Sequence, residues 1–195
     1  MKTTRSYSMT ARARSMEQTR QRILAATVEL HLERPAVSIA LDDIAARAEV
    51  SVQTILRHFG SREGLVETAT LQAQQDVREE RRTPVGDVEA AVKVLMSHYE
   101  ARGDSVLVLL AQEGTEAFAA GITAGGKALH RTWVAETFAP YLTTDDDESL
   151  LDLLVVATDV YTWKLLRRDR SLSRAATTAR ITRLVTALLS EPGTV

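Results

Sequence analysis

The spacing of apolar positions along the chain predicts helices rather than strands. In the N-terminal third, Ile23, Thr27 and Leu30 fall on one helical face, at the intervals of three and four residues that an amphipathic helix requires. No segment keeps a strict alternation of period two for long. Aromatic residues make up only 5% of the chain, which also disfavours a β fold. The pattern therefore predicts an all-α protein.

Breaks between the periodic segments predict where the helices begin and end. Pro35 blocks continuation of the first helix, and Ser51 and Ser173 are candidate N-caps. Pro84 and Gly86 mark the best candidate boundary between subdomains. We expect helices at about residues 16–34, 42–48, 51–59, 62–82, 87–101, 104–112, 115–138, 146–168 and 173–190.

The composition is that of an ordinary globular protein. Of the 195 residues, 45% are apolar and 26% are charged. The longest unbroken apolar run, residues 106–111, is far shorter than the ~18–20 residues that a membrane span needs. The N-terminus has no apolar signal segment, and without cysteine the chain has no disulfide framework or Cys-based metal site. A cytoplasmic location is the default expectation.

Charge is distributed unevenly along the chain. The net charge is −2, which by itself does not suggest a nucleic-acid partner. However, residues 71–195 sum to −4, whereas the first 22 residues have a net charge of +5. A solvated N-terminal tail is the simplest interpretation of this bias, and a segment that attracts phosphates is the alternative. The basic residues in question are Lys2, Arg5, Arg12, Arg14, Arg20 and Arg22.

Residues 42–59, DDIAARAEVSVQTILRHF, contain the most informative local pattern. Two short helices are separated by only three or four residues. Small Ala45 lies four positions before the turn residue Glu49, and Val50 and Ile55 can fill the space between the helices. Ser51 caps a second helix whose exposed face is polar. A helix-turn-helix needs these features, although a plain helical bundle can show similar spacing.

The stretch Ile23–Ala69 resembles the N-terminal DNA-binding domain of TetR/AcrR-family transcriptional regulators. The strongest matches are Ile23-Leu24-Ala25-Ala26, Glu33-Arg34, Asp43-Ile44-Ala45, Val50-Ser51, Thr54, Arg57-His58-Phe59 and Ser61-Arg62-Glu63-Gly64-Leu65. The resemblance implies a homodimer in which a three-helix helix-turn-helix domain precedes a helical domain that binds a small effector. On this basis we divide the chain into a flexible basic arm (1–15), a helix-turn-helix DNA-binding domain (16–62), a connecting helix (63–83) and an effector-binding and dimerisation domain (84–195).

The resemblance places the DNA-contacting face on the helix that starts at Ser51, whose N-terminal end points toward bases. Gln53 is the best candidate base reader, because an amide hydrogen-bonds adenine in bidentate fashion for about 1–3 kcal/mol of discrimination. Arg62 matches a phosphate-contacting basic residue at a helix N-terminus. The alternative for Arg57 is a solvated or ion-paired side chain, and for His58 it is a packed ring. The predicted DNA-binding residues are Ser51, Val52, Gln53, Thr54, Arg57, His58 and Arg62.

Several positions depart from the family pattern, which usually has a basic residue and a glycine at positions 52 and 53 and a tyrosine at position 56. Val52, Gln53 and Leu56 therefore weaken phosphate anchoring, and the base preference cannot be borrowed from the family. Glu49 replaces a frequent turn glycine, at a cost of about 1 kcal/mol if its φ is positive. Ala40 stands where a hydroxyl residue often caps the first helix of the pair. The basic arm can compensate through non-specific phosphate contacts.

Two C-terminal segments are candidates for a dimer interface. Residues 150–166 are too apolar for a helix that is covered on one side only, and the last helix carries apolar residues at i, i+3, i+4 and i+7. The resemblance assigns these helices to a dimeric four-helix bundle, and packing inside the monomer is the alternative. The predicted interface residues are Leu154, Ile181, Leu184, Val185 and Leu188.

The effector pocket is predicted only as a set of candidates on the middle helices, each of which is more often a core residue. His98 and His130 are polar groups able to orient a ligand. Asp159 lies inside an apolar run, where an unpaired charge is costly; it faces either a cationic or hydroxylated ligand or, more often in such cases, an arginine. The predicted pocket residues are Met96, Tyr99, Leu110, Phe118, Trp133, Asp159 and Trp163.

The sequence carries no signal for a cofactor, a metal site or an enzyme. Gly121, Gly125 and Gly126 lack the GxGxxG or Walker spacing, and the histidines form no HExxH motif. The leading prediction is a ligand-responsive regulator, a repressor that binds a pseudo-palindromic operator in double-stranded DNA as a homodimer and is released by a small-molecule effector. The alternative is a TetR-like helical module that binds a ligand or partner without specific operator binding.

Overall fold

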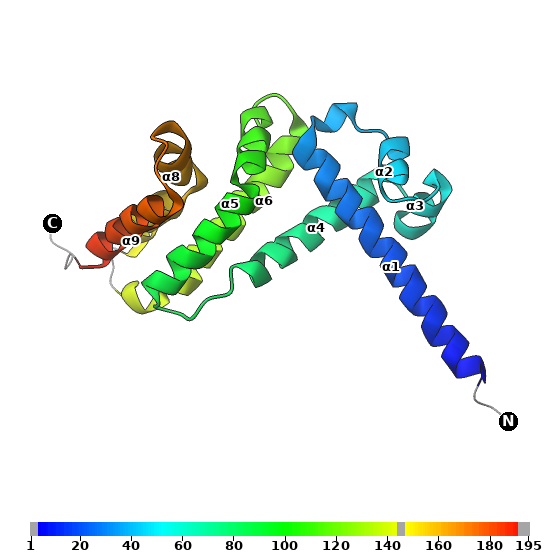
Figure 1. Ribbon diagram of the computed structural model, residues 1–195, viewed down its shortest axis with the longest axis horizontal. Helices are drawn as coiled ribbons and strands as arrows, with labels where there is room; N and C mark the ends of the chain where they lie inside the picture. Colours follow the sequence, from blue (N-terminus) through cyan, green and yellow to red (C-terminus); the bar gives the residue numbers. More distant parts are fainter. Residues whose placement is uncertain (1–3, 144–146, 191–195) are drawn as a thin grey trace. The chain divides into compact units, whose positions relative to one another are not determined.

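Figure 1 shows the computed structural model of the chain, in which residues 4–143 and 147–190 are described. The description leaves out the side chains of residues 4–11, 36, 117, 118 and 147. Across the described residues the secondary structure is helical, without strands, which confirms the predicted fold class. The chain divides into two compact units, residues 1–73 and 74–195.

The N-terminal unit is built from three helices and part of a fourth. They are α1 (Thr4–Glu33), α2 (Leu41–Arg47), α3 (Val52–Phe59) and α4 (Arg62–Glu80), with a short 3-10 turn, η1 (Ala36–Ser38), after α1. α2 packs against both α1 and α3. The core of this unit consists of Ile23, Leu24, Ala26, Leu30, Ile39, Ile44, Ala45, Ala48, Ile55, Leu65 and Ala69.

α1 begins well before the predicted start at about residue 16, so most of the segment predicted as a flexible arm is helical. Residues 4–15 contain neither proline nor glycine, and Ala11, Arg12, Ala13 and Arg14 are of types with high helix propensity. The polarity of this segment was the reason for predicting an arm. Polarity alone does not oppose a helix, because Arg has nearly the helix propensity of Leu.

The division between the units falls between Ala73 and Gln74, inside α4, rather than at the break predicted around Pro84. The end of α4 belongs to the C-terminal unit through its side-chain contacts. Glu80 accepts hydrogen bonds from Arg102 at 2.5 Å and from His98 at 3.2 Å, both on the following helix. Long-range contacts of this kind leave no mark in local composition.

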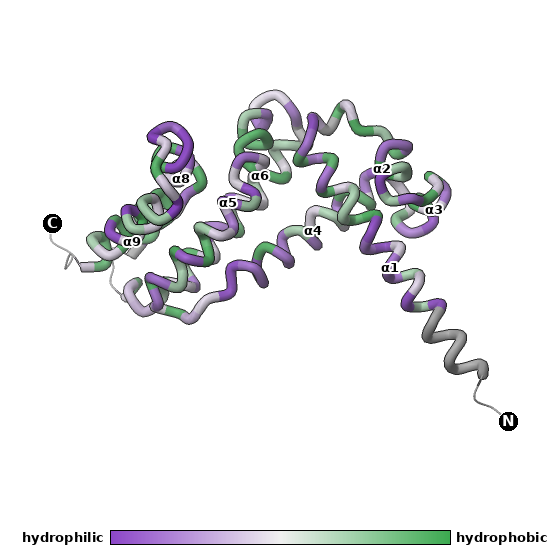
Figure 2. The backbone as a smooth tube through the Cα atoms, in the orientation of Figure 1, coloured by the Kyte–Doolittle hydropathy of each residue, from purple (hydrophilic) through white to green (hydrophobic). Residues whose placement is uncertain are grey.

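The C-terminal unit contains the remaining helices, α5 (Val88–Gln112), α6 (Ala117–Thr137), η2 (Ala139–Tyr141), α7 (Asp147–Thr158), α8 (Val160–Lys164), a π-helical turn η3 (Leu165–Asp169) and α9 (Arg174–Ser190). α5 packs against α6, α8 and α9, and α7 contacts both α6 and α9. Hydrophobic and hydrophilic residues both occur along α5 and α9 (Figure 2), and each helix contributes buried residues to the core of the unit.

α5 is a single helix where the sequence predicted two, at 87–101 and 104–112. Gly103, near the predicted break, lies within the helix and is buried. A Cβ atom at this position would come within 2.6 Å of the Trp163 ring. Gly103 is therefore explained by the close approach of the Trp163 indole rather than by a break in the helix.

Conversely, the helix predicted at 146–168 is interrupted at Asp159. Its carboxylate accepts a hydrogen bond from the backbone N–H of Tyr161 at 2.8 Å and caps α8. We predicted that Asp159 would face a ligand or an arginine in the middle of one apolar helix. The structure instead gives it an N-cap role, the reason that an acidic residue is tolerated between two apolar segments.

Candidate functional site

The helix-turn-helix is formed by α2, a tight turn and α3. Ala45 and Ala48 are buried at the helix crossing, where their small side chains allow close approach, and Ile55 is fully buried between the helices. The backbone N–H of Val50 donates to the Ala45 carbonyl at 2.9 Å and closes the turn. Glu49 has φ +55°, so a non-glycine residue occupies the left-handed region at the position where a glycine is frequent.

Two different caps begin the helices of this motif. Ser51 caps α3 as predicted: its hydroxyl accepts the Thr54 N–H at 3.2 Å and lies 3.0 Å from the Thr54 hydroxyl. Ala40, which precedes α2, has no side-chain acceptor. The reciprocal half of a capping box is present, because the Asp43 carboxylate accepts the Ala40 N–H at 2.8 Å. This bond, followed by the one from Arg34, lowers the pKa of Asp43.

The exposed face of α3 presents only part of the predicted DNA-binding set. Gln53 and Arg57 are exposed, and Leu56, where the family usually has tyrosine, is 40% exposed. Val52 is half-buried against the core of the unit. His58 is also half-buried, with its ring centroid 6.0 Å from that of Phe59. Of the predicted set, the capping Ser51, Gln53 and Arg57 are exposed, whereas Thr54 is half-buried like Val52 and His58.

Arg62 lies at the start of α4, where the sequence predicted a phosphate contact. Its side chain is half-buried, and Nη2 donates to the Ile39 carbonyl at 3.0 Å. The guanidinium therefore holds the segment that leads into α2.

The basic residues of α1 fall into two groups. Arg12 and Arg14 are exposed. Arg20 and Arg22, in contrast, contact the helix-turn-helix: the Arg20 guanidinium carbon lies 5.5 Å from the centre of the Phe59 ring, and Arg22 lies 3.8 Å from the Glu49 carboxylate. The side chains that the sequence interpretation grouped together therefore differ in their partners.

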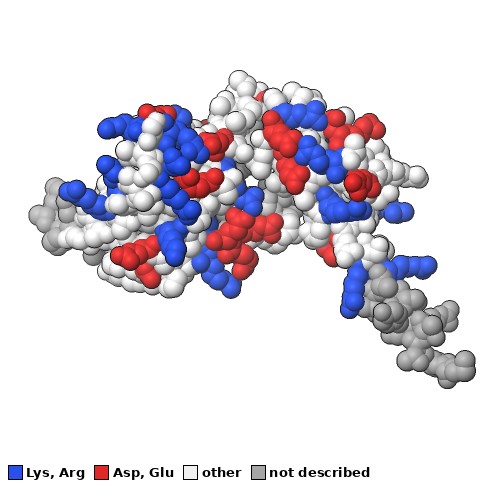
Figure 3. Space-filling view, viewed as in Figure 1, with Lys and Arg blue, Asp and Glu red and all other residues white. Residues whose placement is uncertain are grey.

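An ion-pair cluster that we did not predict joins α1 to α2. Arg47 donates to Glu33 at 2.8 and 3.0 Å and to Glu29 at 3.2 Å. The hydrogen bond from Arg47 is the main reason that the pKa of Glu33 lies below its ordinary value. The i, i+4 spacing of the two glutamates on α1 is visible in the sequence, but their partner on α2 is not. Basic and acidic side chains are interspersed on the face drawn in Figure 3.

Residues 23–69, which include this motif, match the family model for bacterial regulatory proteins of the tetR family. The match covers α2, the turn and α3, together with the core of the N-terminal unit described above. In this segment the chain is therefore similar to bacterial regulatory proteins of the tetR family.

Solved structures of regulators share the TetR fold over most of the chain. A transcriptional regulator from Rhodococcus sp. Rha1 has a TM-score of 0.63 at 17% identity, with 87% of this chain and 95% of that chain covered. Salmonella enterica GusR also has a TM-score of 0.63, at 22% identity, with 88% and 95% covered. A TetR transcriptional regulator from Rhodococcus sp. RHA1 has a TM-score of 0.54 at 20% identity, with 92% and 100% covered. No curated protein matches the chain.

In the C-terminal unit, most predicted pocket residues lie in the core. The Tyr99 hydroxyl donates to the Thr158 carbonyl at 2.9 Å, and the Trp133 indole donates to the Arg81 carbonyl at 2.8 Å. Asp159 caps α8, and the side chain of Phe118 lies outside the described part of the structure. The predicted pocket residues that belong to the buried core are Met96, Tyr99, Leu110, Trp133 and Trp163.

The predicted dimer-interface residues are also divided between the buried core and the exposed surface. Leu154, Ile181 and Val185 are at most 1% exposed and belong to the core of the unit, which corrects their assignment to a surface between protomers. Leu188 is half-buried against that core, whereas Leu184 is 43% exposed. Each of α7 and α9 packs one apolar face against the core of the monomer. Sequence periodicity does not show which of the apolar residues lie on that buried face and which remain exposed.

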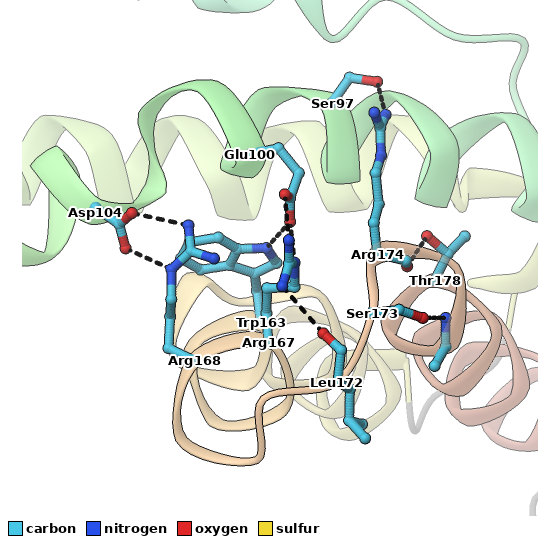
Figure 4. A network of polar contacts seen from close by, with 11 residues as sticks. Ser97, Glu100, Asp104, Trp163, Arg167, Arg168, Leu172, Ser173, Arg174 and Thr178 are labelled. Atoms are coloured by element: carbon cyan, nitrogen blue, oxygen red, sulfur yellow. Dashed lines mark hydrogen bonds and ion pairs between the residues drawn. The ribbon is translucent and has the colours of Figure 1, made fainter.

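A polar network fixes α8 and η3 against α5 (Figure 4). Glu100 accepts hydrogen bonds from the Trp163 indole at 3.1 Å and from Arg167 Nε at 2.8 Å. Burial opposes ionisation of Glu100, but the Arg167 and Trp163 bonds outweigh it and lower its pKa. Arg168 forms a bidentate pair with Asp104 and lies over the Trp163 ring, 4.6 Å from its centre. These contacts hold the Trp163 indole in place beside Gly103.

Arg81, just after α4, is a residue that the sequence interpretation missed. It is 6% exposed, and its Nη1 lies 3.2 Å from His130 Nδ1. Tyr99 and Trp133 flank the guanidinium carbon, with ring centres at 5.4 and 5.8 Å. Arg81 follows a run of charged residues that reads as a solvated helix end, so its burial gave no local signal.

An open groove of about 700 Å³ lies between α5 and α9. It contains none of the predicted pocket residues, and its walls are formed by Glu89, Lys93, Thr178, Ala179, Thr182, Arg183, Thr186 and Ala187. No helix in the described ranges is long and apolar enough to cross a membrane. The same ranges bring together no group of three or more His, Cys, Asp or Glu residues able to hold a metal ion.

Proposed function

We propose that this protein is a ligand-responsive repressor of the TetR family that acts in the cytoplasm and binds a pseudo-palindromic operator as a homodimer. A small-molecule effector releases it from DNA. The observation that carries this proposal is the helix-turn-helix of α2 and α3, whose exposed face presents Gln53 and Arg57 within the segment that matches the family.

In the proposed complex, the N-terminal end of α3 enters the major groove. Gln53 reads a base edge, and Val52 and Thr54 flank it with apolar and hydroxyl contacts. Arg57 and His58 reach phosphates further along α3. Arg62 contacts a phosphate at the N-terminal end of α4, while Ser51 holds the first turn of α3 in place.

Dimerisation uses apolar residues that remain exposed on the last helices of the monomer. Leu184 of the predicted interface remains in this set. The exposed apolar residues on α7, α8, η3 and α9 are Leu153, Val156, Tyr161, Leu165 and Leu184. Pairing these faces in a dimer would present two recognition helices to half-sites roughly 34 Å apart, one helical turn of DNA.

Release requires an effector that prefers the conformation with lower DNA affinity, because only differential binding shifts a two-state equilibrium. α4 is the connection through which this shift travels. It begins at Arg62, which contacts the helix-turn-helix, and ends beside Arg81 in the core of the C-terminal unit.

Selection of bound DNA from random fragments tests the proposal. The full-length protein should enrich a motif with two inverted half-sites whose centres lie about 10 base pairs, or a multiple, apart. A folded dimer that enriches no motif would contradict operator recognition and support the alternative, a helical module that binds a ligand or partner.

A further inference from the structure

The interior of the C-terminal unit holds a cation without a carboxylate partner. Arg81 is 6% exposed, and no described carboxylate lies within ion-pair distance of its guanidinium. Glu80, its chain neighbour, is bonded to Arg102 and His98. Asp159 is bonded to the backbone of α8. Both carboxylates attract Arg81 electrostatically, but each forms its hydrogen bonds elsewhere.

The side chains that hydrogen-bond Arg81, those of Tyr99 and His130, are neutral. Burial, and then the charge of Arg81, lower the pKa of His130 to about 3, so the ring is uncharged at neutral pH. Its Nδ1 must accept from Arg81 Nη1, which places the ring proton on Nε2. Nε2 then donates to the Thr158 hydroxyl at 3.2 Å, whose own proton goes to the Leu154 carbonyl at 2.7 Å. His130 orients the guanidinium without balancing its charge.

One edge of the guanidinium is left incomplete. Nε of Arg81 is buried and has no hydrogen-bond partner among the described residues, and the same holds for the Thr83 hydroxyl two residues later. Nε and Nη2 form the edge that a carboxylate engages with two parallel hydrogen bonds. The rings of Tyr99 and Trp133 lie beside the guanidinium, 5.4 and 5.8 Å from its carbon, and supply an apolar surface.

A buried charge without a hydrogen-bonded counter-ion is costly, and proteins pair such charges when they are purely structural. We propose that the effector of this protein is a small organic carboxylate that pairs with the Nε–Nη2 edge of Arg81 and packs its apolar part against Tyr99 and Trp133. The inference rests on the proposed ligand response and names the chemical class of the ligand. A monocarboxylate balances one guanidinium, whereas a phosphate dianion would bring a second buried charge.

The position of Arg81 also explains how such a ligand would act on DNA binding. Arg81 continues the hydrogen-bonding pattern of α4, since its N–H donates to the Val77 carbonyl at 3.0 Å. Its carbonyl accepts the Trp133 indole. A carboxylate that draws the guanidinium toward itself therefore acts on the end of the helix that begins at Arg62.

Thermal unfolding of the full-length protein with matched ligand pairs tests the proposal. The pairs are benzoate and benzamide, phenylacetate and phenylacetamide, and octanoate and octanamide, each at millimolar concentration. At least one acid should raise Tm progressively with concentration, because a ligand that binds only the folded state stabilises it, and its amide should not. Equal shifts from acid and amide, or no shift from any acid, would overturn the proposal.

Variants test whether the acid-induced shift in Tm depends on Arg81. Arg81→Met should abolish the acid-induced shift, and Arg81→Lys, which keeps the charge but lacks the two-donor edge, should reduce it. Arg82→Met is the matched control: it removes the same charge from the next residue, whose side chain is 78% exposed, and should leave the shift unchanged. A shift that persists in Arg81→Met would contradict the assignment.

The experiments distinguish a failure of the operator-binding proposal from a failure of the carboxylate proposal. If DNA selection yields a motif and no acid shifts Tm, the carboxylate assignment is wrong and operator binding stands. If an acid shifts Tm through Arg81 and selection yields no motif, the ligand class stands and the repressor function is wrong. When both hold, the active acid should release the wild-type protein, but not Arg81→Met, from the selected DNA.

Discussion

The two units of the molecule differ in where they keep their charged side chains. In the N-terminal unit, Arg34 and Arg47 pair with carboxylates at the surface, and the buried polar residues are Thr27 and His31. The C-terminal unit buries a guanidinium and two imidazoles, those of Arg81, His98 and His130. Under the proposed function, the N-terminal unit keeps the donors that contact DNA at its surface, and the C-terminal unit keeps the polar groups that bind the ligand inside.

The largest expected effect is on the free energy of unfolding, which core truncations should lower by similar amounts in both units. Trp163 is fully buried, and Trp163→Ala should destabilise the protein by about 3–5 kcal/mol because a cavity replaces the indole. Ile55→Ala in the N-terminal unit should cost about 2–5 kcal/mol. Urea unfolding measures both. Leu71→Ala, at a side chain 55% exposed, is the control; an equal loss there would undermine the comparison.

The buried histidines should make stability depend on pH. Burial is the largest cause that lowers the pKa of His98 to about 4 and of His130 to about 3. The unfolded chain binds these protons near pH 6.5, so the free energy of unfolding should fall as pH drops below 6.5, by about 1 kcal/mol per pH unit for each histidine. Unfolding between pH 7 and 5 measures this.

His130→Gln sharpens that prediction, because it removes one of the titrating groups while keeping a polar side chain. The decline of stability between pH 6.5 and 5 should become shallower in this variant. An unchanged slope would mean that His130 is not held neutral by burial.

Substitutions of the predicted DNA-binding residues should distinguish base contacts from phosphate contacts. Gln53→Ala should relax the base preference at one position of each half-site, by about 1–3 kcal/mol of discrimination. Arg62→Ala should weaken binding to all sequences alike and lower the salt dependence. Binding of each variant to the selected motif and its single-base changes measures both effects. An unchanged preference in Gln53→Ala would remove Gln53 from the base-reading set.

The smallest effect concerns the strained turn. Glu49 has φ +55°, so Glu49→Gly should stabilise the protein by about 1 kcal/mol, since glycine adopts this conformation without the penalty of a Cβ. Loss of the exposed contact with Arg22 should matter little. Glu49→Gln removes the same charge and keeps the Cβ, so it should not stabilise. A gain in both variants would point to charge rather than to backbone strain.

Local patterns sufficed to predict the N-terminal unit. Ser51 as an N-cap, the small Ala45 at the helix crossing and the turn at Glu49 are encoded within a few residues of one another, and the structure has all three. The predicted start of α1, at about residue 16, was wrong, because residues 4–15 are polar but still have high helix propensity.

The C-terminal unit could not be predicted to the same depth, because its decisive contacts join distant parts of the sequence. The Arg81–His130 bond spans 49 positions, and the Trp163–Glu100 bond spans 63. Gly103 is explained only by the tryptophan packed on it. Apolar periodicity predicted the helices, but it could not distinguish core residues such as Val185 from exposed residues such as Leu184.

The central claim is that α3 recognises a particular DNA sequence. The most direct measurement is the ratio of the dissociation constants of the full-length protein for scrambled DNA and for the selected motif, at about 150 mM salt. The account predicts a ratio of about a thousand or more, as for specific regulators. A ratio below about ten, from a dimer that is folded and active in ligand binding, would contradict it.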